Sequence, residues 1–171
     1  MKRILSVLCA VLLLASLAVT SASAIANPWA DCNTMGEAKR IARFPMTAPE
    51  QVDGYRQSGI QAMKSGVIQV FYEGQDGSRL ILRKGKRTQY PTDQSLHGDY
   101  NEYNTYREYT FRGEPVRTRG NTISLSLRYK NPGIYRISNA SWDRGLYKYT
   151  LTVTESGIFT DTLETFVLQT R

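Results

Sequence analysis

The side chains with the clearest catalytic potential are His97 and Cys32. The sequence has one histidine and two cysteines, and nucleophilic catalysis needs a nucleophile, a base and a group that orients the base. Cys32 and His97 would fill the first two roles, with Asp93 or Asp99 as the orienting group. None of them lies in a local motif of known cysteine enzymes. We therefore expect a solvated loop histidine and a half-buried structural cysteine, and no enzyme.

A second group of residues has the chemistry of a metal site. Asp93, His97, Asp99 and Glu102 fall within ten residues of one another, so oxygen and imidazole ligands could gather there. Their spacing matches neither an EF-hand nor a zinc pattern. The remaining acids are scattered singly, so the sequence defines no glycosidase-type carboxylate pair. We expect a solvated acidic loop with no metal and no cofactor.

The strongest binding signal is a basic and aromatic stretch. The run Arg83-Lys84-Gly85-Lys86-Arg87 is followed by tyrosines interleaved with polar residues. Tyrosine offers a stiff apolar face with a hydroxyl, and arginine can grip phosphate or carboxylate with two hydrogen bonds. An envelope polysaccharide, an anionic wall polymer or a protein partner would fit such a surface; the alternative is a solvated face with tyrosines covering a sheet. The candidate ligand-binding residues are Arg83, Lys84, Lys86, Arg87, Tyr100 and Tyr103.

The first 24 residues have the layout of a secretory signal peptide. Lys2 and Arg3 precede an apolar run over residues 4–19, and small residues end at Ala24. This order predicts cleavage after Ala24, with Ala26 as an alternative position. The apolar run is shorter than the ~20 residues that span a bilayer. We predict an exported protein with one globular domain over residues 25–171 and no stable membrane insertion after cleavage.

Charge and cysteine content narrow the functional classes further. Losing Lys2 and Arg3 would lower the formal net charge from +7 to +5, which favours anionic envelope polymers and lipid headgroups. Export makes nucleic acid an unlikely class of partner. Cys9 lies in the predicted signal peptide, so Cys32 would have no internal disulfide partner, although it could pair with a cysteine of another chain. The fold must then rest on burial and hydrogen bonding.

The period of the hydrophobic residues predicts the helices and strands that would position these side chains. Thr34 and Glu37 fit a capping box, and apolar residues at helical spacing predict a helix of about ten residues from Met35. A closing helix is predicted after a cap at Thr160 or Asp161. Between the helices the period changes to two, which predicts strands near residues 60–63, 67–72, 80–84, 106–111, 116–119, 123–129, 134–138 and 146–154.

This order of elements predicts an α+β fold. We expect a curved antiparallel sheet of about seven strands, with a short N-terminal helix and a C-terminal helix covering one face. Trp142 is expected in the core. Residues 85–105 form the one extended polar segment and are predicted to be a functional or mobile loop.

Short motifs along the chain together resemble one bacterial family. They are Asn27-Pro28-Trp29, Asp31-Cys32, Glu37-Ala38, Phe44, Pro49, Gly54-Tyr55, residues 68–72 and 81–84, Gly98-Asp99-Tyr100-Asn101-Glu102-Tyr103, Gly113, Gly120-Asn121 and Trp142. With these motifs the sequence is similar to domain of unknown function 4367, which occurs in secreted proteins, lipoproteins and the extracytoplasmic parts of anti-sigma-like membrane proteins. The resemblance implies an extracytoplasmic domain and no known reaction. The chain departs from the family in having no lipobox cysteine and an additional hairpin turn at Asn131-Pro132-Gly133.

Three functional hypotheses follow from these features. The favoured one is a non-enzymatic extracytoplasmic interaction or sensing module that binds an envelope component or a partner protein. The second is a soluble carrier that holds a small apolar or anionic ligand between the helices and the sheet. The third is a hydrolase that uses Cys32 or scattered carboxylates.

Overall fold

The computed structural model describes residues 27–123, 134–154 and 157–171. The predicted signal peptide with its cleavage position at Ala24 lies outside the described residues. So do most of the predicted strand over residues 123–129 and the turn at Asn131-Pro132-Gly133. Among the described residues, no helix is both long and apolar enough to cross a membrane.

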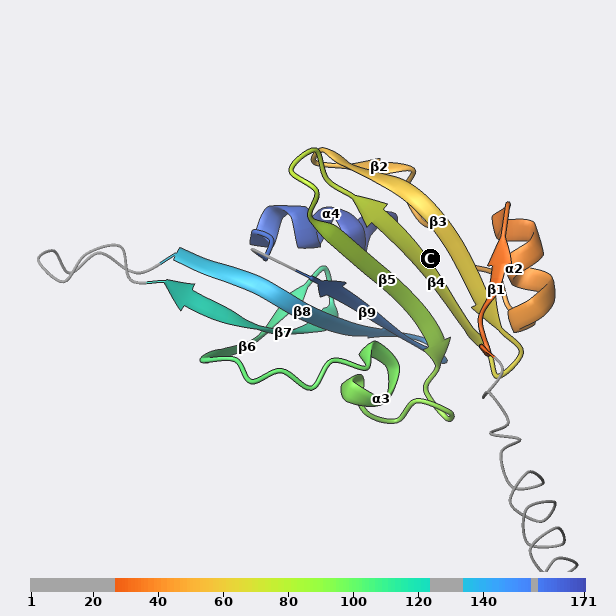
Figure 1. Ribbon diagram of the computed structural model, residues 1–171. Helices are drawn as coiled ribbons and strands as arrows, with labels where there is room; N and C mark the ends of the chain where they lie inside the picture. The colour runs from red at the N-terminus through yellow and green to blue at the C-terminus, as the bar shows by residue number, and fades with distance from the viewer. Residues whose placement is uncertain (1–26, 124–133, 155–156) are drawn as a thin grey trace, which may run out of the picture.

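The described residues form an open antiparallel sheet of nine strands at the centre of the fold. Eight strands follow the order β1-β3-β4-β5-β9-β8-β7-β6, and the short β2 pairs with β3. The chain builds β1 to β5 first, leaves the sheet, and returns through β6 to β9 so that β9 pairs with β5 (Figure 1). The strands are β1 (Ala30–Cys32), β2 (Gln51–Val52), β3 (Tyr55–Met63), β4 (Val67–Glu73), β5 (Arg79–Lys86), β6 (Thr105–Phe111), β7 (Glu114–Ile123), β8 (Ile134–Arg144) and β9 (Tyr147–Val153).

Three described helices flank the sheet: α2 (Met35–Ala42), α3 (Asp93–His97) and α4 (Thr160–Gln169). The predicted cap of α2 is confirmed, because the Thr34 hydroxyl accepts a hydrogen bond from the Glu37 amide at 3.2 Å. The Glu37 carboxylate in turn accepts from the Asn33 amide at 2.7 Å. The predicted cap of α4 is one or two residues late, since Phe159 is the N-cap and has no side-chain cap bond.

One face of the sheet carries the hydrophobic core. Tyr72 packs edge-on against Phe166 of α4, with ring centroids 5.0 Å apart. Trp142 is fully buried, as predicted, and stacks on Tyr149 at 5.5 Å. Each large side chain buried in this way contributes about 1.5–3 kcal/mol. Alternate positions of neighbouring strands supply the rest of this face, including Ile60, Val70, Leu82, Leu151 and Ala140.

The opposite face is crossed by a continuous line of polar residues, here called the polar row. Its members lie directly opposite one another on successive strands from β1 to β6. Hydrogen bonds run along its first part, from Gln61 to Asp31 at 2.8 Å, from Gln69 to Gln61 at 2.6 Å and from Arg83 to Gln69 at 2.8 Å. In order, the polar row is Asp31, Gln61, Gln69, Arg83, Thr150, Ser141, Arg117 and Glu108.

The predicted polar loop over residues 85–105 is a structured cover for this polar face. β5 continues to Lys86, and α3 begins after Thr92, whose hydroxyl accepts from the Ser95 amide at 3.1 Å. α3 contacts β5 and β9 and lies on the side of the sheet opposite α4 (Figure 1). The α+β antiparallel prediction is therefore confirmed in outline, whereas the strand count and the helix in this segment differ from it.

Close packing of β7 against β8 gives the first testable prediction. A Cβ atom on Gly120 would lie 1.9 Å from the Arg136 carbonyl oxygen, so Gly120→Ala must displace one strand. We expect it to lower the free energy of unfolding by at least about 2 kcal/mol, measured by urea denaturation. The matched variant is Gly36→Ala in α2, where the added Cβ atom would lie 3.7 Å from its nearest neighbour, the Thr34 hydroxyl. Its free energy of unfolding should instead rise by about 0.5–1 kcal/mol. Equal midpoints for Gly120→Ala and the native protein would contradict this packing.

Candidate functional site

Strand alternation separates the predicted basic cluster instead of presenting it as one surface. Arg83 and Lys84 are neighbours on β5 and point to opposite faces of the sheet. The Arg83 side chain belongs to the polar row and donates from Nη1 to the carbonyl oxygens of Leu96, at 3.1 Å, and His97. It thus holds the end of α3 onto the sheet and is not a free ligand contact.

Lys84 is buried on the core face, with an exposed fraction of 4 %. Its Nζ atom donates to the Pro45 carbonyl oxygen at 2.7 Å and lies 4.3 Å from the centre of the Tyr147 ring. The rings of Tyr149 and Phe44 follow at 5.3 and 5.6 Å, so cation–π attraction offsets part of the lost hydration. Burial, followed by the charge of Arg144, lowers the pKa of Lys84 to about 8. The prediction that Lys84 contacts a ligand at the surface is therefore corrected.

Lys86 and Arg87 remain exposed and line a groove at one end of the sheet. The groove has a volume of about 580 Å³ and lies between the segment after β5 and the β8–β9 turn. Leu146, at that turn, is 78 % exposed. This basic groove is lined by Lys86, Arg87, Thr88, Pro91, Asp143, Gly145, Leu146, Tyr147 and Lys148.

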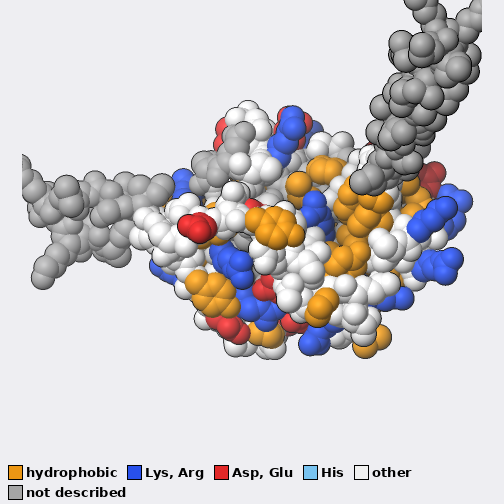
Figure 2. All heavy atoms as spheres, turned by 60° about the horizontal axis from the view of Figure 1, so that its bottom comes forward, with side chains coloured by type: hydrophobic (Ala, Val, Ile, Leu, Met, Phe, Trp, Pro, Cys, Tyr) orange, Lys and Arg blue, Asp and Glu red, His pale blue; other side chains and the backbone are white. Residues whose placement is uncertain are grey.

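Backbone contacts fix the two walls of the basic groove relative to each other. The Arg87 amide donates to the Leu146 carbonyl oxygen at 3.0 Å, and the Arg87 guanidinium donates to the Gly145 carbonyl oxygen at 3.5 Å. Basic and hydrophobic side chains are interspersed over the face of the molecule that includes α3 (Figure 2). The basic groove is therefore a preformed feature with both cationic and apolar walls.

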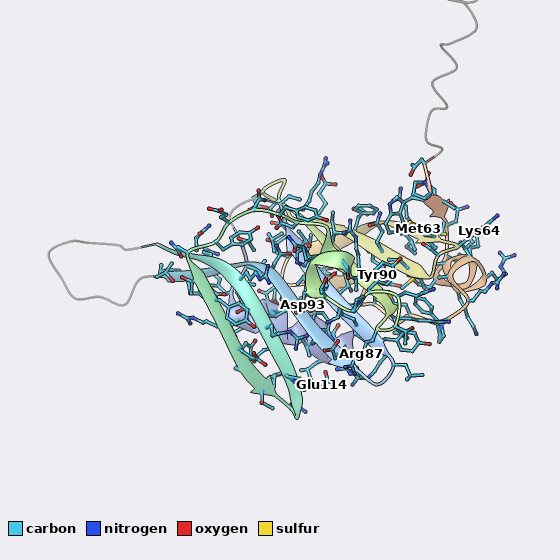
Figure 3. The ribbon with its side chains drawn as sticks, turned by 90° about the horizontal axis from the view of Figure 1, so that it is seen from below. Met63, Lys64, Arg87, Tyr90, Asp93 and Glu114 are labelled. Atoms are coloured by element: carbon cyan, nitrogen blue, oxygen red, sulfur yellow. The ribbon has the colours of Figure 1, made fainter. Side chains whose placement is uncertain are left out.

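A partly buried charge cluster adjoins the basic groove. Asp93, the first residue of α3, accepts from Arg117 at 3.0 and 3.3 Å, from Lys148 at 2.7 Å and from the Ser141 hydroxyl at 2.6 Å. Asp143 lies 3.0 Å from Arg117, 3.3 Å from Lys148 and 3.8 Å from the more exposed Arg87. Figure 3 labels Asp93 and Arg87 in the view from below. Five charged groups thus meet where α3, the basic groove and three strands converge.

The electrostatics of the cluster favour a charged Asp93. Burial alone would raise its pKa, but hydrogen bonds from Arg117, Lys148 and Ser141 outweigh burial and hold the pKa of Asp93 well below its usual range. The same contacts raise the pKa of Arg117 against the opposing effect of its burial. Asp93 therefore carries its negative charge at every physiological pH.

The loop after α3 is fastened to β8 rather than open to a ligand. The Tyr103 hydroxyl donates to Asp99, and the Asn139 amide donates to the same carboxylate. Thr152 on β9 completes the chain by donating to Asn139 at 2.9 Å. Of the two tyrosines predicted to bind a ligand, Tyr103 is committed to this network, while Tyr100 is 76 % exposed.

Cys32 and His97 do not form a catalytic pair. Cys32 lies on β1, where its thiol donates to the Ala30 carbonyl oxygen at 3.5 Å, and α3 packs on β5, which two strands separate from β1. Burial and the nearby charges of Glu37 and Asp31 raise the pKa of Cys32, which is opposite to the shift of an activated thiol.

His97 is buried in α3, so the expectation of a solvated loop histidine is wrong. Its Nδ1 atom accepts from the Asp99 amide at 2.8 Å. Burial lowers the pKa of His97 more than Asp99 raises it, so a neutral ring is favoured. Asp93 faces Arg117, and Glu102 is exposed on the loop. Within the described ranges, no three histidine, cysteine or acidic side chains gather as metal ligands.

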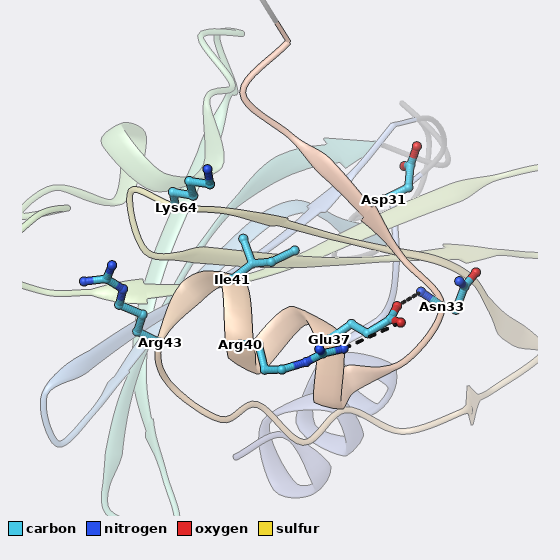
Figure 4. Close-up of a pocket in the computed structure, with 7 residues that line it drawn as sticks. All are labelled: Asp31, Asn33, Glu37, Arg40, Ile41, Arg43 and Lys64. Carbon is cyan, nitrogen blue, oxygen red and sulfur yellow. Dashed lines mark hydrogen bonds and ion pairs between the residues drawn. The ribbon is translucent and has the colours of Figure 1, made fainter.

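A second groove of about 550 Å³ runs between β1 and α2 (Figure 4). Its charged side chains are of both signs, and several are already paired. Glu37 accepts from the Asn33 amide and lies 3.8 Å from Arg40. Its lining has two acidic and three basic residues, whereas the basic groove has one acidic residue, Asp143, against three basic ones. Its lining residues are Asp31, Asn33, Glu37, Arg40, Ile41, Arg43 and Lys64.

The residues that surround Asp93 were not among the predicted site residues. Lys148 lies between Tyr147 and Tyr149 on β9, and Arg117 lies between Val116 and Thr118 on β7. A charged residue between two core-facing positions of a strand points to the face opposite the core. The sequence therefore indicates the face on which Arg117 and Lys148 lie, but it does not indicate which loop covers them.

Comparisons with known proteins found no match: no family model, no curated protein and no solved structure is similar to this chain. The resemblance to domain of unknown function 4367 therefore stays a prediction, and the function must be argued from the geometry.

The buried position of Lys84 predicts an unusual pH dependence of stability. Its pKa of about 8 in the folded state lies below that of an unfolded lysine, so the unfolded chain binds more protons between the two values and stability rises with pH. From pH 7 to pH 9.5, the native protein should gain about 2 kcal/mol relative to Lys84→Met, measured by urea denaturation. The control Lys86→Met replaces an exposed lysine and keeps Lys84, so its stability should rise with pH as that of the native protein does. Parallel pH profiles for the native protein and Lys84→Met would show that Lys84 is not desolvated.

Proposed function

We propose that this protein is a non-catalytic binding module that holds an anionic component of the cell envelope in the basic groove. The observation that carries the proposal is the combination of exposed Lys86 and Arg87 with a Leu146 side chain that is 78 % exposed. A large apolar side chain with this exposure, placed beside cations in a groove, is a feature of contact surfaces. The favoured ligand is an anionic wall polymer.

Each wall of the groove has a physical role in this proposal. Lys86 and Arg87 attract the anionic groups of the polymer, and Arg87 can form two hydrogen bonds to one such group. Leu146 and Tyr147 offer apolar surface to the polymer backbone. Because the Arg87 amide already bonds to Leu146, little ordering of the walls is needed when the ligand binds.

The predicted signal peptide and the resemblance to domain of unknown function 4367 support an extracytoplasmic setting for this binding. The overall charge of +7, or +5 after the predicted cleavage, adds a long-range attraction to anionic material. A partner protein with an acidic surface would use the same groove.

The core offers no support for the carrier hypothesis. Tyr72, Leu163 and Phe166 are fully buried and fill the interface between α4 and the sheet. A ligand held between this helix and the sheet would have to displace them. We therefore place the binding site at the surface.

Neutralising the basic groove should weaken binding. We expect Lys86→Ala/Arg87→Ala to bind purified cell wall carrying anionic polymers about tenfold less tightly, because two cationic contacts of up to about 1 kcal/mol each are lost. The measurement is a co-sedimentation isotherm at 50 and 300 mM salt, with thermal unfolding as the check on folding.

The matched control is Lys39→Ala/Arg40→Ala on α2, which removes the same charge from exposed residues elsewhere. It should retain binding close to that of the native protein. An equal loss in both double variants would mean that binding follows net charge, and the basic groove would then not be the site.

A further inference from the structure

Three neighbouring strands present the donors of a carboxylate receptor, and the receptor is already filled by the chain itself. Arg117 on β7 and Ser141 on β8 lie directly opposite each other, and Lys148 projects from β9. Arg117 contacts both oxygens of the Asp93 carboxylate, at 3.0 and 3.3 Å, while Ser141 and Lys148 bond one oxygen each, at 2.6 and 2.7 Å. Such paired and charge-assisted hydrogen bonds are how proteins bind free carboxylates.

The receptor and the group it holds differ in how firmly they are built. The donors project from the middle of the sheet, where backbone pairing fixes them. Asp93 arrives on α3, a helix of five residues, and a helix this short is unstable without its tertiary contacts. Asp93 therefore reaches the donors on a short segment that depends on its contacts with the sheet, which include the bonds from Arg83 to the Leu96 and His97 carbonyl oxygens.

The charge balance favours an anion in this position. Arg117, Lys148 and the more exposed Arg87 face Asp93 and Asp143. Without Asp93, three cations would face one carboxylate, which leaves a net charge of +2. The receptor would then attract any accessible carboxylate.

The basic groove leads to this receptor. Lys148 and Asp143 line the groove and also belong to the charge cluster. A ligand bound in the groove would therefore place its anionic groups beside Lys148. On the α3 side, the cavity next to Asp93 has a volume of only about 10 Å³ with Asp93 in place, room for about one water molecule, so a ligand group must take the position of the Asp93 carboxylate. The donors there are placed to bond the two oxygens of a carboxylate.

We propose that Arg117, Ser141 and Lys148 form a receptor for a carboxylate group of the ligand, and that Asp93 occupies this receptor until the ligand displaces it. This inference rests on the proposed function, since it assigns the ligand of the basic groove to the carboxylate-bearing polymers. Displacement would remove the contact that anchors the first turn of α3, whereas Arg83 still holds its last residues, and it would thus link binding to local opening of α3.

The first test empties the receptor and offers it a free carboxylate. In Asp93→Ala, 0.2 M sodium acetate should raise the midpoint of thermal unfolding by at least about 3 °C more than 0.2 M sodium chloride does. The native protein, whose receptor is filled, and the double variant Asp93→Ala/Ser141→Ala should show no such difference. If Asp93→Ala is unfolded in chloride, recovery of its circular dichroism spectrum in acetate is the same readout. Equal effects of acetate and chloride on Asp93→Ala would overturn the receptor.

The second test uses the native protein and follows amide hydrogen exchange. Poly-glutamate should speed exchange of residues 93–99 about tenfold as Asp93 is displaced, whereas polyphosphate at equal charge should not. Unchanged exchange with bound poly-glutamate, or equal acceleration by polyphosphate, would overturn displacement by carboxylates. Separate experiments test the two proposals. Wall binding by Lys86→Ala/Arg87→Ala tests the basic groove as the binding site, and stabilisation of Asp93→Ala by acetate tests the carboxylate receptor.

Discussion

A sheet that crosses the whole molecule has two faces to cover, and in this protein only one of them is apolar. The polar row places a side chain that needs a hydrogen bond on every strand from β1 to β6. Such groups are costly to bury unless they are paired. The segment with α3 meets this need at two points, with the carbonyl oxygens that Arg83 binds and with the carboxylate of Asp93, whereas the buried Thr150 hydroxyl has no hydrogen-bond partner among the described residues. The cover, the charge cluster and the wall of the basic groove therefore share one set of polar contacts. Loss of Asp93 would leave Arg117 and the buried Lys148 with Asp143 as their remaining carboxylate partner.

The sequence predicted best those elements whose contacts are apolar or local. The Thr34 cap of α2 and the alternating strands that contribute Leu82 and Leu151 to the core follow from spacing alone, because burial imposes a period on them. β8, in contrast, continues through Trp142 to Arg144, beyond the predicted strand over residues 134–138. α3 escaped prediction because it covers a polar face and so carries no apolar period beyond Leu96 and His97. β1 and β2, with three and two residues, are too short for any period to show.

The binding site shows the same division. Period-two alternation places Arg83 and Lys84 on opposite faces of the sheet. It does not show that aromatic rings enclose Lys84, because Phe44 and Tyr147 come from distant segments and contact it only in the tertiary fold. Lys86 and Arg87 are exposed where β5 ends, since Lys86 is its last paired residue, opposite Tyr147, and Arg87 follows it. Arg117, Ser141 and Lys148 are brought together by strands that are distant in the sequence, so only the strand order shows that they meet.

The pairing of β5 with β9 has a consequence for the kinetics of folding. These strands join residues 79–86 to residues 147–153, and the two halves of the sheet become one only when this contact forms. Loop closure over so long a stretch slows folding, because its entropy is lost before the contacts that offset it are made. The first five strands are thus left with β5 as an unpaired edge until the chain is nearly complete. If the predicted signal peptide directs export, such a delay would postpone the final structure until the segment with β9 has crossed the membrane.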